Sequence, residues 1–140
     1  MADIFSPKKR SEIMSRIHSG KRKRSWTSLE LRVHNWLKAK HIRHRMMPSA
    51  EGNPDVVIFP SNGGDPLYVF IDGCFWHCCP IHYRRPKSNV EYWISHVEES
   101  DRRREELRRR LPYRWIRVWE HEVRDNSFKE KILGALGGGR

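Results

Sequence analysis

The sequence predicts a single α/β domain. Its 140 residues are enough for one hydrophobic core but hardly for two. Segments with the 3.6-residue period of helices alternate along the chain with short apolar runs that are typical of strands. Hydrophobic residues make up 37% of the chain and charged residues 32%, which excludes a disordered chain and a membrane span.

Four helices are predicted from capping residues and apolar periodicity. Residues 6–17 begin with Ser-Pro, a common helix start, and form a short basic helix. Residues 27–40 open with a capping box, in which Thr27 and Glu30 bond each other's backbone N–H groups. Residues 90–110 form a long helix whose glutamate and arginine pairs, four residues apart, indicate a solvent-exposed face. The last helix spans residues 128–136.

Four strands are predicted at residues 41–46, 55–59, 67–71 and 115–119. The second and third are joined by Ser-Asn-Gly-Gly-Asp-Pro, a turn sequence, so we expect them to form an antiparallel hairpin in a buried sheet. Residues 73–89 contain cysteine, histidine and proline without periodicity. They predict a long loop that something, such as a metal ion, must hold in place.

The net charge of +11 is concentrated near the N-terminus, because residues 1–47 contain 13 Lys and Arg against three acidic residues. This distribution predicts a basic arm at residues 1–25 for a polyanionic partner, a main domain at 26–136 and a flexible tail at 137–140. The first residues lack the apolar run of a secretory signal, so a cytoplasmic location is expected.

Cysteine and histidine residues in the long loop predict a zinc site. Cys74, Cys79 and His82 are spaced so that a loop can wrap them around one tetrahedral Zn²⁺ ion. His121, just after the last predicted strand, is the best remote candidate for a fourth ligand, and Cys78 is a rival for Cys79. Four ligands would make the site structural, whereas the alternative is three thiols that bind nothing.

Two further residues can take part in catalysis. Asp55 stands at the start of an apolar strand, where a carboxylate can bind a hard cation such as Mg²⁺, although Pro-Asp is also a common turn or strand cap. His77 lies inside the predicted zinc loop. It is either a general acid or base near neutral pH or a zinc ligand itself.

Large aromatic side chains occur in and after this loop: Phe75, Trp76, Tyr92 and Trp93. They can simply belong to the core. Beside a basic arm, however, aromatic side chains on a loop can also wedge between base pairs, and unstacking costs least at a mismatched step.

These motifs resemble those of the very short patch repair (Vsr) DNA mismatch endonucleases. The resemblance covers residues 2–123, and the run Gly73-Cys-Phe-Trp-His77 after a strand is its most specific part. The other motifs that carry it are Phe5-Ser-Pro-Lys-Lys-Arg-Ser-Glu-Ile-Met-Ser-Arg16, Thr27-x-x-Glu30, Gly52-Asn-Pro-Asp55, Val69-Phe-Ile-Asp72, Lys87-Ser-Asn-Val-Glu-Tyr-Trp93, Asp101-Arg-Arg103 and Val118-Trp-Glu-His121.

The resemblance implies a restriction-endonuclease-like fold, with a mixed central sheet flanked by helices, and a Mg²⁺-dependent nick on the 5′ side of the T in a T:G mismatch. Asp55 and the main-chain carbonyl of Ile71 would hold Mg²⁺. His77 would be the general acid or base, and Glu30 would support the site through metal-bound water, alongside its capping role.

The resemblance also implies a structural Zn²⁺ site and a DNA wedge. Its zinc ligands would be Cys74, Cys79, His82 and His121, and its intercalating residues Phe75, Trp76 and Trp93. The implied partner is double-stranded DNA with a T:G mismatch, with mismatch-repair proteins as further candidates. The protein is expected to be a monomer without a membrane partner, because a nick in one strand needs one active site.

Two departures from the family pattern concern supporting residues. Asp72 stands where the family has a histidine that pairs with the carboxylate matching Asp101, so two carboxylates are expected there to share a proton or bind a metal. The Asp/Glu-x-Lys signature of the wider superfamily is absent, which fits a mechanism based on histidine. Two alternatives stay open: a zinc-stabilised DNA-binding module without catalysis, and a nickase of the same fold with a different target.

Overall fold

The computed structural model describes residues 26–138, and within them four strands form one mixed sheet in the order β1-β2-β3-β4. Strands β1 (His44–Met46), β2 (Val56–Ile58) and β3 (Leu67–Asp72) pair antiparallel, whereas β4 (Trp115–Trp119) runs parallel to β3. The predicted α/β class and the β2–β3 hairpin are therefore confirmed. The predicted helix at residues 6–17 and the arm at 1–25 lie outside the described residues.

Helix α2 (Ser28–Ala39) begins with the predicted capping box and ends in a turn that shortens the following strand. His41 adopts the left-handed conformation with φ of 57°, and the N–H groups of His41 and Ile42 donate to the carbonyls of Lys38 and Leu37. This bonding pattern closes a helix end. Residues 41–43 are consequently part of the turn, and the first strand begins at His44 instead of residue 41.

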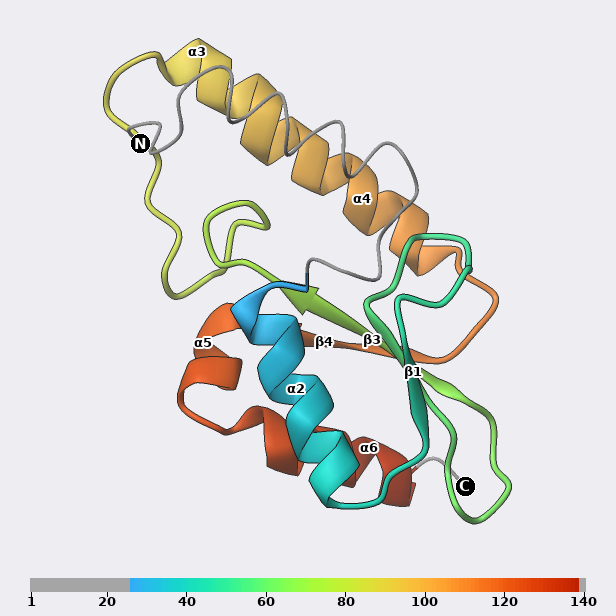
Figure 1. The fold of residues 1–140 in the computed structure, drawn as a ribbon. Coiled ribbons are helices and arrows are strands. Elements are labelled where there is room, and N and C mark those ends of the chain that lie inside the picture. The colour runs from blue at the N-terminus through green and yellow to red at the C-terminus, as the bar shows by residue number, and fades with distance from the viewer. Residues whose placement is uncertain (1–25, 139–140) are drawn as a thin grey trace.

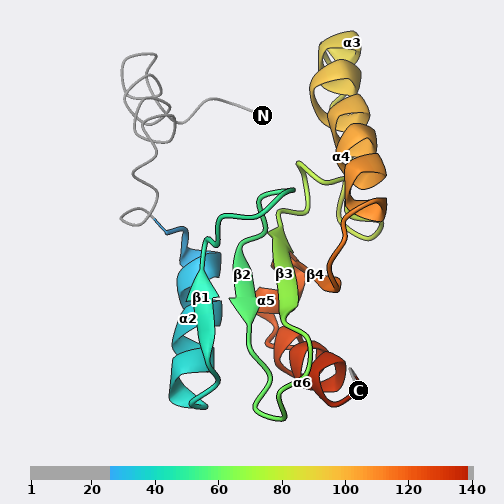
Figure 2. The ribbon, with the colours of Figure 1, turned by 90° about the vertical axis from the view of Figure 1, so that its right-hand side faces the viewer.

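Helices α2, α5 (Glu120–Arg124) and α6 (Phe128–Gly138) cover one face of the sheet, and the long helix α3–α4 lies on the other side (Figures 1 and 2). The core sits under the first group. Its fully buried side chains include Val33 and Leu37 from α2, Val69 from β3, and Phe128 and Ile132 from α6. No helix within residues 26–138 is long and apolar enough to cross a membrane.

The alternation of β3 gives the two faces of the sheet different chemistry. Leu67, Val69 and Ile71 belong to the apolar core, whereas Phe70 and Asp72 meet Arg108 of the long helix on the opposite face. Because successive side chains of a strand point to opposite faces, the end of β3 presents neighbouring residues to both sides of the sheet.

The long helix is confirmed, but it is composite: α3 (Val90–Trp93) continues as a π-helix, η2 (Ile94–Glu98), and then as α4 (Glu99–Arg109). Its predicted i,i+4 pairs are wrong for three glutamates, of which Glu106 bonds Arg109, three residues away. Glu98 bonds Arg85 and Glu105 bonds Arg117, because both partners lie on neighbouring segments of the fold. Part of this helix therefore faces the protein and not solvent.

Two further differences concern the C-terminal segment. The short helix α5 was not predicted and begins directly after β4, where the Glu122 side chain accepts the Trp119 N–H at 2.8 Å. Helix α6 continues to Gly138, two residues past the predicted end. It thus includes the first two residues of the predicted tail.

Candidate functional site

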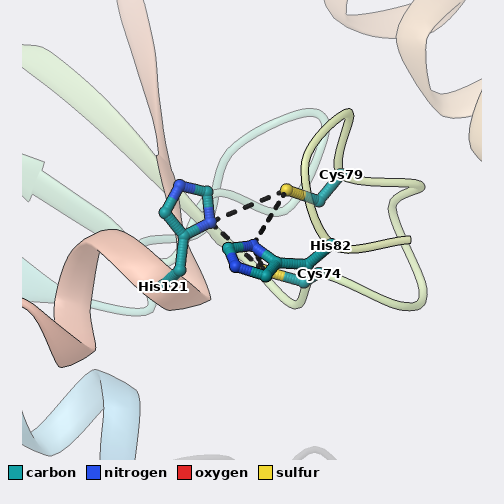
Figure 3. Close-up of side chains that lie close together, drawn as sticks. All are labelled: Cys74, Cys79, His82 and His121. Atoms are coloured by element: carbon teal, nitrogen blue, oxygen red, sulfur yellow. Dashed lines mark hydrogen bonds between the residues drawn. The ribbon is translucent and has the colours of Figure 1, made fainter. Parts of the chain in front are cut away.

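The four predicted zinc ligands come together beside the end of the sheet (Figure 3). Three are supplied by the loop after β3, and His121 is supplied by the first turn of α5. Their ligand atoms all lie within 4.8 Å of one another. Nδ1 of His121 lies 3.4 Å from Sγ of Cys74 and 3.6 Å from Sγ of Cys79, and Nδ1 of His82 lies 4.0 and 3.8 Å from the same two sulfur atoms.

This arrangement fits a zinc ion. Around tetrahedral zinc, a sulfur and a nitrogen ligand lie about 3.5 Å apart, since Zn–S is about 2.3 Å and Zn–N about 2.0–2.1 Å. Cys74 and Cys79 are buried, and burial raises the pKa of the Cys74 thiol, so a cation is needed to favour its thiolate. Cys78 lies outside the cluster, in a turn where its backbone φ is 53°. Cys79, and not Cys78, is therefore the candidate ligand.

A second contact fastens the loop to α5. The Glu120 side chain accepts a hydrogen bond from the backbone N–H of Cys74 at 3.1 Å and pairs with Arg124 at 2.8 Å. His121 follows Glu120 in the same turn, so α5 holds the loop through two neighbouring residues. Metal binding at this cluster would fix the position of the residues between Cys74 and Cys79, among them His77.

Asp55 and Glu30 form a pair of carboxylates on the α2 side of the sheet. The Oδ2 atom of Asp55 accepts the Ile71 N–H at 2.7 Å, which fixes the carboxylate at the end of β3. Oε1 of Glu30 accepts the Thr27 N–H at 2.8 Å, as the capping box requires. Within residues 26–138 neither carboxylate forms an ion pair with a basic side chain.

The surroundings of Asp55 disfavour its negative charge. Burial, followed by the charge and hydrogen bond of Glu30 and the charge of Asp72, raises the pKa of Asp55 to about 8, against the opposing hydrogen bond from Ile71. Two neighbouring carboxylates are suited to a divalent metal ion with oxygen ligands. The donor set around Asp55 therefore fits the Mg²⁺ site expected from the sequence.

His77 lies on the α4 side of the sheet, between two carboxylates. Its Nε2 atom is 3.6 Å from Asp72 Oδ1, and its Nδ1 atom is 3.5 Å from Asp101 Oδ1. Burial, opposed by the charge of Asp72 and reinforced by nearby arginines, lowers the pKa of His77 to about 4. The imidazole is therefore neutral at pH 7 and able to accept a proton, and it is not part of the zinc cluster.

Asp72 does not share a proton with Asp101, which corrects one expectation from the sequence. Arg108 donates to its two oxygens at 2.6 and 3.1 Å, and Arg117 Nε donates at 2.7 Å. Burial would raise the pKa of Asp72, but the hydrogen bonds of Arg108 and the charges of His77, Arg108 and Arg117 lower it. The carboxylate is therefore ionised and paired with arginine.

The three residues predicted to intercalate form one aromatic cluster. The ring centroid of Phe75 lies 5.1 Å from that of Trp76 and 5.6 Å from that of Trp93. Trp76 is 46% exposed, whereas Phe75 and Trp93 are half-buried. Tyr92, 52% exposed and 4.9 Å from Trp93, extends the exposed part of the cluster. The exposed Trp76 ring thus packs against the half-buried rings of Phe75 and Trp93.

The end of β3 joins the two halves of the candidate site. Ile71 bonds Asp55 on one face, and the next residue, Asp72, contacts His77 on the other. The sequence analysis did not find Arg104, Arg108 and Arg117, because arginine is normally exposed. Their spacing was a usable signal: Arg104 and Arg108 follow Asp101 by three and seven residues, which places all three on one helix face.

Several known proteins are similar to this chain. A family model described as DNA mismatch endonuclease Vsr matches residues 2–82. The type II nicking enzyme V.NmeAIP of Neisseria meningitidis is 32% identical over 142 residues, covering 97% of this chain and 94% of that protein. V.XorIIP of Xanthomonas oryzae pv. oryzae is 33% identical, covering 97% of this chain and 92% of that protein. V.NaeI of Lentzea aerocolonigenes is 38% identical over 81 residues, covering 56% of this chain and 46% of that protein.

Proposed function

The chain belongs to the Vsr family of DNA mismatch endonucleases, and we propose that it nicks one DNA strand on the 5′ side of the T in a T:G mismatch. Such mismatches arise when 5-methylcytosine is deaminated. The observation that carries the proposal is that two carboxylates, Asp55 and Glu30, which form no ion pair within residues 26–138, lie with a neutral, half-buried His77 around the end of one strand. The relatives named as nicking enzymes support cleavage of a single strand.

Asp55 and the main-chain carbonyl of Ile71 would hold Mg²⁺, and Glu30 would act through water bound to the ion. A magnesium ion there would stabilise the negative charge that develops on the scissile phosphate. The hydrogen bond from Ile71 N–H keeps the Asp55 carboxylate in one orientation. Glu30 is held in the same way by the capping box, so both carboxylates are positioned before metal or DNA binds.

His77 would accept the proton of the attacking water while the water oxygen bonds the phosphorus and the bond to the leaving oxygen breaks. A base of this kind contributes about 10²–10⁴-fold to the rate. Its low pKa keeps the imidazole unprotonated before the reaction. The carboxylates of Asp72 and Asp101, near its two nitrogen atoms, would stabilise the imidazolium that forms.

Recognition of the mismatch would depend on the aromatic cluster. Trp76, supported by Phe75 and Trp93, would insert beside the mispaired bases, where unstacking costs least. The basic residues 1–25 would grip the DNA backbone and make binding fall steeply with salt. A nick in one strand needs one active site, so we expect the protein to act as a monomer. We expect it to act in the cytoplasm, and mismatch-repair proteins are candidate partners.

A cleavage assay tests this proposal. The protein is incubated with Mg²⁺ and a panel of DNA duplexes. Each duplex has a T:G pair, another mismatch or a T:A pair at its centre, and each central pair is placed in several flanking sequences. We expect one strand of the T:G duplex to be cut and the T:A duplex to stay intact. Asp55→Asn should abolish cutting and His77→Ala should slow it by about 10²–10⁴-fold, while zinc content stays near one equivalent in both variants. Preferential cutting of another mismatch would indicate a nickase with a different target, and binding without any cutting would indicate a DNA-binding module.

A further inference from the structure

One face of α4 carries polar side chains that point into the protein. Asp101, Arg104, Glu105 and Arg108 are spaced by three, four and seven residues, so they lie on the same side of the helix. Arg104 donates to the backbone carbonyl of Trp76 at 2.9 Å, and Asp101 contacts His77 at 3.5 Å. A helix face that normally packs through apolar residues is used here to contact the loop that holds His77.

Asp72 is the most firmly held member of this polar region. Its side chain is 2% exposed, and both of its oxygens accept bonds from Arg108, itself 6% exposed. A third bond is donated by Arg117 of β4, whose guanidinium also pairs with Glu105 of α4. The Arg108 guanidinium lies 3.9 Å from the centre of the Phe70 ring, which leaves it little freedom to move. Arginine side chains of both α4 and β4 thus hold the Asp72 carboxylate in place.

The stability of the fold does not by itself explain this arrangement. Burying an ion pair costs desolvation energy that the attraction between the charges often fails to recover, and apolar side chains of similar volume are frequently as stable. The two carboxylates beside His77 also differ. Asp72 is fully bonded, whereas Oδ1 of Asp101 is buried without a hydrogen-bond partner in the described part of the chain.

We propose that Asp72, held by Arg108 and Arg117, is a positioning residue that fixes the His77 imidazole through its Nε2 edge. The inference rests on the proposed function, in which His77 takes a proton from water. The 3.6 Å separation is long for a hydrogen bond, but such contacts are often long in free enzymes and shorten when substrate binds. Asp101, on the opposite nitrogen atom, completes the pair of contacts that orient the ring.

The double variant Asp72→Leu/Arg108→Met distinguishes a role of Asp72 in positioning His77 from a role in folding. It replaces the buried ion pair by apolar side chains, so the melting temperature should stay within a few degrees of the wild type. Arg117 keeps Glu105 as its partner. We expect kcat for nicking to fall about 10²-fold with the Kd for the duplex unchanged, because a base misplaced by about 1 Å costs that much. Glu106→Gln, an exposed change on the same helix, is the control and should leave kcat unchanged.

The same double variant is then combined with His77→Ala. If Asp72 acts through His77, adding it to His77→Ala should lower kcat by no more than about twofold, because residues that act as a unit are not additive. A full 10²-fold further loss would show that Asp72 acts elsewhere and would overturn the proposal. An unchanged kcat in the double variant, when His77→Ala itself is impaired, would overturn it as well.

An NMR measurement keeps the inference separate from the proposed function. The ring signals of His77 are compared between the wild type and the double variant without DNA, with His82 and His121 as internal references. We expect the His77 signals to shift or broaden while those of the references stay in place. Unchanged His77 signals would refute positioning even if the protein cuts DNA, whereas the expected change would support it even if His77→Ala retained activity and the proposed base were wrong.

Discussion

The replacement Asp55→Asn should stabilise the metal-free protein while it abolishes cleavage. In the free protein the Asp55 carboxylate is partly buried beside Glu30 and lacks a cationic partner within residues 26–138. Asparagine does not ionise, so folding no longer requires this group to take up a proton, and its amide oxygen can still accept the Ile71 N–H. A residue kept for metal binding is thus expected to lower the free energy of unfolding when no metal is bound.

The size of the effect follows from the pKa of Asp55, which rises from 3.8 to about 8 on folding. At about 1.4 kcal/mol per pH unit, this interval sets a ceiling of about 6 kcal/mol above pH 8 and of about 4 kcal/mol at pH 7. The weaker hydrogen bond of a neutral acceptor and partial solvation reduce it, so we expect a gain of about 2 kcal/mol at pH 7. For a domain of this size that gain corresponds to a rise of roughly 4–8 °C in Tm.

The pH dependence gives the signature of this mechanism. Below about pH 4 both the folded and the unfolded wild type carry a proton on Asp55, so the two proteins should differ little in stability. Between about pH 4 and 8 the unfolded chain loses this proton while the folded protein retains it, and the wild type is progressively destabilised relative to the variant. Above about pH 8 the difference should level off.

Chemical unfolding of both proteins without divalent cations, from pH 4 to 9, checks this prediction. Asp65→Asn, which changes an exposed carboxylate in the turn between β2 and β3, is the matched control and should show no such pH dependence. A destabilised Asp55→Asn variant, or a stability difference that is the same at pH 4 and pH 8, would refute the reasoning.

Three further predictions concern the metal sites and the wedge. Cys79→Ser should lose the zinc, about one equivalent by elemental analysis, and lower Tm, whereas Cys78→Ser should keep its zinc because Cys78 lies outside the cluster; equal zinc content in both variants would contradict the ligand set. Trp76→Ala should weaken binding to a T:G duplex by about 10–100-fold, as expected for the loss of one stacking contact of 1–3 kcal/mol, with fluorescence anisotropy as the measurement; unchanged affinity would exclude a wedge. At subsaturating Mg²⁺ the nicking rate should rise with pH from 6 toward about 8, because the metal must displace the proton of Asp55; a Mg²⁺ requirement that is independent of pH over this range would argue against Asp55 as a ligand.

The parts of the fold that local chemistry determines were predictable from the sequence. The capping box places the start of α2 at Ser28, and the turn between residues 61 and 66 specifies the β2–β3 hairpin. The zinc ligands were also accessible, because three of them lie within nine residues and the spacing suits one loop. His121 required a guess about the strand end, and it lies instead in α5, a helix too short to leave a periodic signal.

The polar region beside His77 could not be predicted, because it depends on tertiary contacts. The glutamates and arginines of residues 98–110 indicate i,i+4 pairs on any isolated helix. In the fold, Arg108 instead bonds Asp72 of β3, and Glu105 bonds Arg117 of β4. The choice between a surface pair and a buried one is decided by which element packs against the helix, and this information is distributed over the whole chain.

Strand-resolved cleavage tests the central claim most directly. The two strands of a T:G duplex carry different labels, and the products are separated under denaturing conditions beside size markers. The account predicts one cut, on the 5′ side of the mismatched T, in that strand only, with none in the T:A duplex and with cutting about 10²–10⁴-fold slower in His77→Ala. Cleavage of both strands, or equal cleavage of the T:A duplex, would contradict it.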